Sequence, residues 1–90
     1  MPLFVVEREL PGINPQMLTS TVVRAKTYCV EISEEGRSVR WIQSFFLPES
    51  SRTHCYFEGV SRDVIEEVNK RANIPFERIS QVVEMTPEGV

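Results

Sequence analysis

The chain has 90 residues, enough for one domain around a single hydrophobic core but not for two. Its hydrophobic fraction of 41% and charged fraction of 26% exclude an intrinsically disordered chain. The net charge of −3 indicates no basic surface, so no nucleic acid is expected as a partner. We expect one ordered domain over residues 1–90, with its core within about residues 2–86.

Two features of the sequence predict a cytoplasmic location. The first residues lack the basic region of a secretory signal peptide, and their apolar run ends at Glu7. No stretch approaches the roughly 20 apolar residues of a membrane-spanning helix, so no membrane partner is expected. In the cytoplasm Cys29 and Cys55 should stay reduced, and their spacing matches no zinc or redox motif.

The first half of the chain predicts a strand, a helix and a second strand. Residues 3–10 begin as an apolar strand and end at a Pro-Gly turn. Asn14 followed by Pro15 is typical of a helix N-terminus, and an apolar stripe continues that helix to about residue 33. Residues 39–47 predict a strand that is apolar on both faces. One face is expected to carry Val39, Trp41, Phe45 and Leu47, and the other Ile42 and Phe46.

The second half repeats this order. A turn at residues 48–51 predicts a hairpin, with residues 53–58 as the returning strand. Ser61 is expected to cap a second helix that ends before Pro75, and residues 78–85 predict the last strand. Alternation in the returning strand places Thr53, Cys55 and Phe57 on one face and His54, Tyr56 and Glu58 on the other.

Two consecutive β-α-β halves predict a ferredoxin-like α+β sandwich. Four antiparallel strands in the order 4-1-3-2 then carry both helices on one face and leave the other face open. Because the second predicted strand is apolar on both faces, we expect two open faces to meet in a homodimer. The residues expected to line this contact are Val5, Ile42, Phe46 and Val82.

A group of polar residues falls on the predicted open face. Glu7 lies on a strand next to the one that carries His54, Tyr56 and Glu58, and it joins them if its strand has the phase that turns it to this face, which the sequence does not fix. A carboxylate, an imidazole and a phenol together suit acid–base chemistry or metal binding. Candidate ligand-binding residues are therefore Glu7, Tyr56 and, through ring stacking, Trp41, and candidate metal ligands are His54 and Glu58. Alternatively, the two glutamates form rim ion pairs with Arg8, Arg40 or Arg52.

Neither cysteine is expected to be a nucleophile. Cys29 falls in the apolar stripe of the first helix. Cys55 points away from His54, because neighbouring strand residues face opposite sides of a sheet. No nucleotide-binding or hydrolase motif occurs in the chain, and no residue is assigned as catalytic.

Four segments of the chain carry a resemblance to a known family. They are residues 6–12 (VERELPG), 39–48 (VRWIQSFFLP), 55–58 (CYFE) and 68–79 (VNKRANIPFERI). Together they resemble a widespread bacterial family, labelled only as a domain of unknown function and grouped with small nickel-binding proteins. The resemblance implies a ferredoxin-like fold and a homodimer. The nickel-binding branch is richer in histidine near the end of the second helix, where this chain has Asn69 and Asn73.

Three hypotheses for the function follow. The first is a small dimeric binding protein whose ligand the sequence does not identify. The second, implied by the resemblance, is a protein that binds nickel or another transition metal through His54, Glu7 and Glu58, with the site either weak or shared across the dimer. The third, by analogy of fold, is a cofactor-free monooxygenase or isomerase of the dimeric α/β-barrel type. Its acid–base residues would be Glu7, His54 and Tyr56, in a cavity between sheet and helices.

Overall fold

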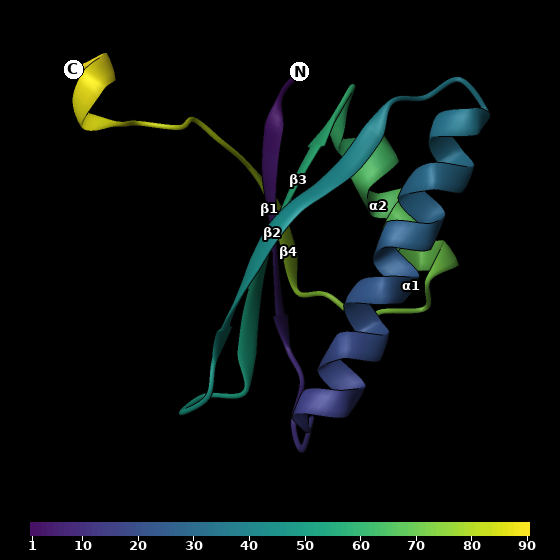
Figure 1. The fold of residues 1–90 in the computed structure, drawn as a ribbon, viewed down its shortest axis with the longest axis vertical. Coiled ribbons are helices and arrows are strands. Elements are labelled where there is room, and N and C mark those ends of the chain that lie inside the picture. The colour runs from purple at the N-terminus through teal and green to yellow at the C-terminus, as the bar shows by residue number, and fades with distance from the viewer.

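A computed structural model describes residues 1–90. Its four strands form one antiparallel sheet in the order β2-β3-β1-β4. Both helices lie on one face of the sheet, and the other face has no helix over it (Figure 1). This arrangement confirms the predicted ferredoxin-like α+β fold. In chain order the elements are β1 (Leu3–Glu9), α1 (Pro15–Glu34), β2 (Val39–Leu47), β3 (Arg52–Gly59), α2 (Arg62–Arg71), β4 (Arg78–Val82) and a 3₁₀ turn (Pro87–Gly89).

The two helices begin in different ways. The side chain of Asn14 accepts a hydrogen bond of 2.8 Å from the backbone N–H of Met17, and Pro15 occupies the first helical position. Ser61 occupies the N-cap position of α2, but its side chain makes no capping hydrogen bond, contrary to the prediction. The carboxylate of Asp63 in the first turn is instead favoured by the helix dipole. Neither helix is both long and apolar enough to cross a lipid bilayer.

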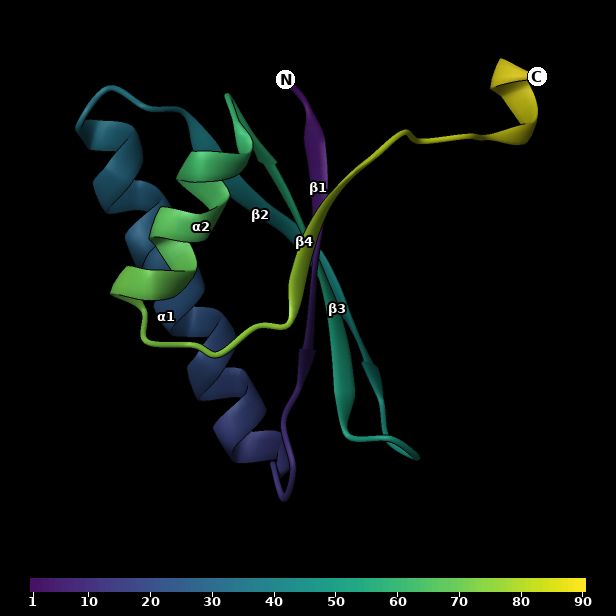
Figure 2. The same ribbon diagram turned by 180° about the vertical axis from the view of Figure 1, so that it is seen from behind.

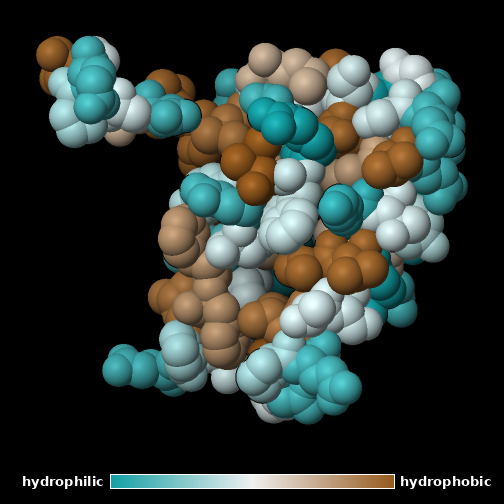
Figure 3. Space-filling model, viewed as in Figure 1, coloured by the Kyte–Doolittle hydropathy of each residue, from teal (hydrophilic) through white to brown (hydrophobic).

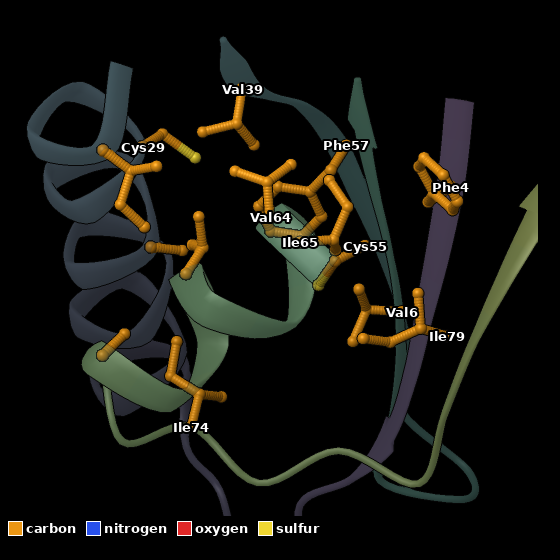
Figure 4. Close-up of a cluster of buried hydrophobic side chains, with 14 residues drawn as sticks. Phe4, Val6, Cys29, Val39, Cys55, Phe57, Val64, Ile65, Ile74 and Ile79 are labelled. Carbon is orange, nitrogen blue, oxygen red and sulfur yellow. The ribbon is translucent and has the colours of Figure 1, made fainter. Parts of the chain in front are cut away.

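The hydrophobic core lies between the helices and the face of the sheet that they cover, called here the inner face (Figure 4). Every second residue of β1 and β3 points into it, because strand side chains alternate. Cys29 and Cys55 are free, buried thiols of this core. Burial raises the pKa of the Cys29 thiol to about 11, so it stays protonated and unreactive at neutral pH. The strand residues of the core include Phe4, Val6, Cys55, Phe57 and Ile79.

The alternate residues of β1 and β3 point to the opposite, open face of the sheet. In β1 these residues are Leu3, Val5 and Glu7, which settles the phase of the first strand. In β3 they are Arg52, His54, Tyr56 and Glu58, as the alternation predicted.

Strand β2 contains a β-bulge in its middle. Trp41 pairs with Phe57, but the next paired residue of β2 is Gln43, so Ile42 is an extra residue without a partner on β3. One extra residue reverses the alternation of side chains beyond the bulge and bends the strand. Before Ile42 the odd-numbered residues of β2 therefore lie on the inner face, and after Ile42 the even-numbered residues do.

The bulge exchanges the faces of two aromatic residues. Phe45 pairs with His54 and so lies on the open face, while Phe46 pairs with Thr53 and so lies on the inner face. The prediction placed Phe46 on the open face, with Phe45 and Leu47 on the inner one, and it was wrong. Its simple alternation did not allow for an inserted residue.

The last strand is shorter than predicted. Val82 pairs with Leu3, the first residue of β1, and Pro2 before it has no N–H with which to extend the ladder. Residues 83–90 leave the sheet on the side opposite the helices (Figures 1 and 2). Val83 and Met85 on this C-terminal tail are 82% and 81% exposed. The tail thus presents apolar side chains next to the open face.

Candidate functional site

The open face carries a row of four chemically different side chains, one from each strand. Phe45 of β2 is opposite His54 of β3. His54 is opposite Glu7 of β1, which in turn is opposite Arg78 of β4. Directly opposed residues of antiparallel strands point to the same face and lie close together. The fold therefore places an aromatic ring, an imidazole, a carboxylate and a guanidinium side by side.

Glu7 is the centre of the charged part of this row. Arg78 Nε donates a hydrogen bond of 2.7 Å to Glu7 Oε2, and Glu7 Oε1 lies 3.9 Å from His54 Nε2. The hydrogen bond from Arg78 holds the pKa of the Glu7 carboxyl below its ordinary value. Glu7 is thus an ionised carboxylate with one oxygen fixed by Arg78 and the other beside His54.

Glu58 belongs to a separate part of the open face. It accepts a hydrogen bond of 2.8 Å from Arg40 Nε, which holds the pKa of its carboxyl below the ordinary value. Glu58 lies four residues from His54 on the same strand, a span of about 13 Å, so the two do not share an ion. No three His, Cys, Asp or Glu side chains of the chain form a group that could hold a metal ion.

Tyr56 and Trp41, the two aromatic candidates, lie on opposite faces of the sheet. Tyr56 is on the open face, where its ring meets that of Phe45 edge to face at 6.2 Å between centroids. Trp41 packs against the core on the inner face, and its Nε1 donates a hydrogen bond of 2.9 Å to Ser44 Oγ. The structure thus groups Tyr56 with Glu7 and His54 and leaves Trp41 apart from them.

A shallow hollow of about 840 Å³ covers the part of the open face between Tyr56 and the C-terminal tail. Hydrophobic atoms gather over the sheet on this side of the molecule, close to where the tail leaves it (Figure 3). His54 does not line this hollow. Its mixed apolar and charged lining includes Leu3, Arg40, Ile42, Glu58, Val82 and Met85.

A second cavity, of about 240 Å³, lies between the inner face of the sheet and α1. The monooxygenase and isomerase hypothesis requires Glu7, His54 and Tyr56 to point into a cavity of this kind. All three lie on the opposite face of the sheet, and none lines this cavity. The structure therefore does not assemble the acid–base set that the hypothesis requires.

Sequence reasoning missed one arginine, Arg78, and misplaced another, Arg8, which was expected in an ion pair at the rim of the open face but is buried without one. Arg78 is the partner of Glu7, whereas only Arg8, Arg40 and Arg52 had been considered. Its signal was its position at the start of the last strand, which the predicted strand order places beside the first. Arg8 points into the core side of β1, and its signal was the alternation that begins with Phe4 and Val6.

Comparison with known proteins places the chain in a family. The sequence model of the family described as nickel responsive protein SCO4226-like matches residues 4–82. The crystal structure of SCO4226 from Streptomyces coelicolor A3(2) has the same fold, with a TM-score of 0.76 and 21% sequence identity over 93% of this chain and 99% of that one. No curated protein matches the chain. Since the family match covers most of its length, the chain belongs to the family of SCO4226-like nickel responsive proteins.

Proposed function

We propose that this protein is a nickel-binding protein, not an enzyme, and that it holds the cation between two copies of the chain that meet through their open faces. The single observation that carries the proposal is the His54–Glu7 pair, 3.9 Å apart on the two central strands of the open face. The family name, nickel responsive protein, supports nickel as the metal to test first.

The donor set of one chain is insufficient for a strong nickel site. Nickel favours imidazole ligands, and the chain has one histidine, His54, with a single carboxylate beside it. Two chains related by a two-fold axis near His54 would bring together two imidazoles and two carboxylates. Each donor would then come from a strand, which is a rigid position for a ligand. The residues fit nickel as a pair of chains and not singly.

Arg78 gives Glu7 its position in this proposal. It holds Glu7 Oε2 and keeps the carboxylate ionised, so Oε1 is the oxygen available to a cation. The positive charge of Arg78 also repels a bound cation, which lowers its affinity. We therefore expect weaker nickel binding than at a site with several histidines.

The apolar side chains around His54 support pairing of the chains. Phe45 is 55% exposed and Leu47 is 37% exposed on the same face. A domain of this size buries a limited fraction of its apolar surface, and a symmetric partner is a common way to cover the rest. We propose that these side chains surround the two-fold contact and that the His54–Glu7 pairs lie inside it.

Calorimetric titration with nickel, together with sedimentation velocity, tests both parts of the proposal. We expect wild-type protein to bind one nickel ion for two chains, with a greater dimer fraction when nickel is present. His54→Ala should lose the binding heat, and Glu7→Gln should weaken binding by about tenfold or more. Glu58→Gln is the matched control, because Glu58 lies on the same face but about 13 Å from His54. No nickel heat from the wild type, or equal heat from His54→Ala, would refute the proposal.

A further inference from the structure

Arg8 is a charged residue in the interior of the molecule. It follows Phe4 and Val6 on the inner side of β1 and is only 2% exposed. No carboxylate of the chain forms an ion pair with it. Its Nη1 donates a hydrogen bond of 3.2 Å to the carbonyl oxygen of Pro75, and its buried Nε has no partner. A buried charge without a counter-charge destabilises a fold, so its presence in so small a domain requires a reason.

Arg8 lines the 240 Å³ cavity between the inner face and α1. No Asp or Glu lines this cavity, so Arg8 is its only charged group. The walls are mainly apolar, with a few hydroxyl groups. The apolar wall residues include Leu18 and Val22 from α1 and Trp41 and Phe46 from β2.

The β-bulge explains why the cavity exists. It turns both Trp41 and Phe46 towards the inner face, although residues five positions apart in a regular strand lie on opposite faces. Between these two rings lies the small residue Ser44, opposite Cys55 on β3. Small side chains between two large ones leave space under the first half of α1.

We propose that Arg8 and this cavity form a binding site for a small monocarboxylate with an apolar body. A guanidinium binds a carboxylate through two parallel N–H···O bonds, and the free Nε of Arg8 lies on one edge of that fork. One cation in an apolar site balances one negative charge, which favours a monocarboxylate over a phosphate dianion. The volume lies below the range of about 300–1,000 Å³ usual for drug-sized ligands, so the ligand is small, of a size similar to benzoate.

The proposal differs from a purely structural role for Arg8 in one measurable respect. If Arg8 served only to link β1 to Pro75, replacing it with methionine would lower the melting temperature. If Arg8 is a binding residue, a carboxylate raises the melting temperature of the wild type but not that of Arg8→Met, whatever the melting temperatures of the two proteins without ligand. Arg62→Met is the matched control, since Arg62 is exposed and forms no ion pair.

Trp41 offers a direct reporter of binding, because it lines the cavity and is the only tryptophan of the chain. We would titrate metal-free protein with benzoate and hexanoate and follow its fluorescence, with uncharged benzamide as the matched probe. We expect a saturable change and a raised melting temperature with a carboxylate but not with benzamide. Arg8→Met should abolish both effects, Arg8→Lys should weaken binding about tenfold, and Arg62→Met should bind as the wild type does.

A second variant keeps the test decisive if Arg8→Met folds poorly. Leu18→Phe enlarges a wall residue and reduces the cavity while the guanidinium stays in place. We expect it to lose the benzoate response and keep a folded spectrum. Three results would overturn the proposal: no saturable response to either carboxylate at millimolar concentration, an equal response to benzamide, or unchanged benzoate binding in Arg8→Met.

Discussion

The two faces of the sheet each carry an arginine, and the two arginines differ in exposure and in ion pairing. On the open face, the Arg78 side chain is 67% exposed and still has a carboxylate partner in Glu7. On the inner face, Arg8 is 2% exposed and has none. Water screens an exposed ion pair so that it adds little stability, whereas an unpartnered buried charge is unfavourable. The comparison indicates that Glu7 and Arg78 on the open face satisfy each other, while Arg8 on the inner face has no counter-charge.

The largest expected effect is a difference in stability between two variants, one that removes a phenylalanine from the inner face and one that removes a phenylalanine from the open face. Phe57 on the inner face has no exposed surface, and Phe45 on the open face is 55% exposed. Phe57→Ala should lower the free energy of unfolding by about 3–5 kcal/mol, because it removes a core ring and leaves a cavity. Phe45→Ala should lower it by less than about 1 kcal/mol, from the lost contact with Tyr56. Urea unfolding of dilute, monomeric protein measures both.

Equal losses of stability in these two variants would contradict the distinction between the faces. Phe45→Ala should have its larger effect on association, because Phe45 lies in the proposed contact between chains. Sedimentation at raised protein concentration should then show a smaller dimer fraction for Phe45→Ala than for the wild type.

A loss of stability of intermediate size is expected from a substitution at Gly59, where β3 meets α2. A Cβ atom placed on Gly59 would lie 2.8 Å from Val64 Cγ1 and 2.9 Å from Ile65 Cδ1. Both neighbours are fully packed in the core, so Gly59→Ala should destabilise the protein by about 1–3 kcal/mol. Gly89→Ala is the control, since its added Cβ meets only Thr86 Oγ1 at 3.4 Å. Thermal unfolding that places Gly59→Ala within error of the control would show that α2 can move away from the sheet.

The fold was predictable from the sequence wherever a regular pattern persisted. In β3 the alternation placed Phe57 inside and His54 outside without error. In β2 the same logic failed after Trp41, because an inserted residue is invisible in a strand that is apolar on both faces. The phase of β1 was equally open, since Leu3 to Val6 are all apolar. Only pairing with β3 fixes it.

The candidate site was predictable only in part, for a related reason. Glu7 and His54 were expected on one face, and strand pairing brings them to 3.9 Å. Their arginine partner depends on the register between β1 and β4, which no local pattern specifies. The binding role proposed for Arg8 depends on the bulge in β2, because the bulge shapes the cavity that Arg8 lines. Properties that rest on register and bulges require the assembled sheet.

The smallest expected effect is the acid sensitivity of the open face. The pKa of Glu7 is lowered from its ordinary value of 4.5, chiefly by the hydrogen bond from Arg78. A carboxyl whose pKa is lower in the folded state contributes stability that is fully present above pH 4.5 and is lost as the pH falls through the folded pKa. The melting temperature of the wild type should therefore fall as the pH is lowered from about 5 to about 3, and the melting temperature of Glu7→Gln should fall less steeply over the same range. Phe57→Ala changes no titrating group and should follow the wild-type slope, offset to lower temperature. A Glu7→Gln profile parallel to the wild type would show that the pair with Arg78 adds nothing to stability.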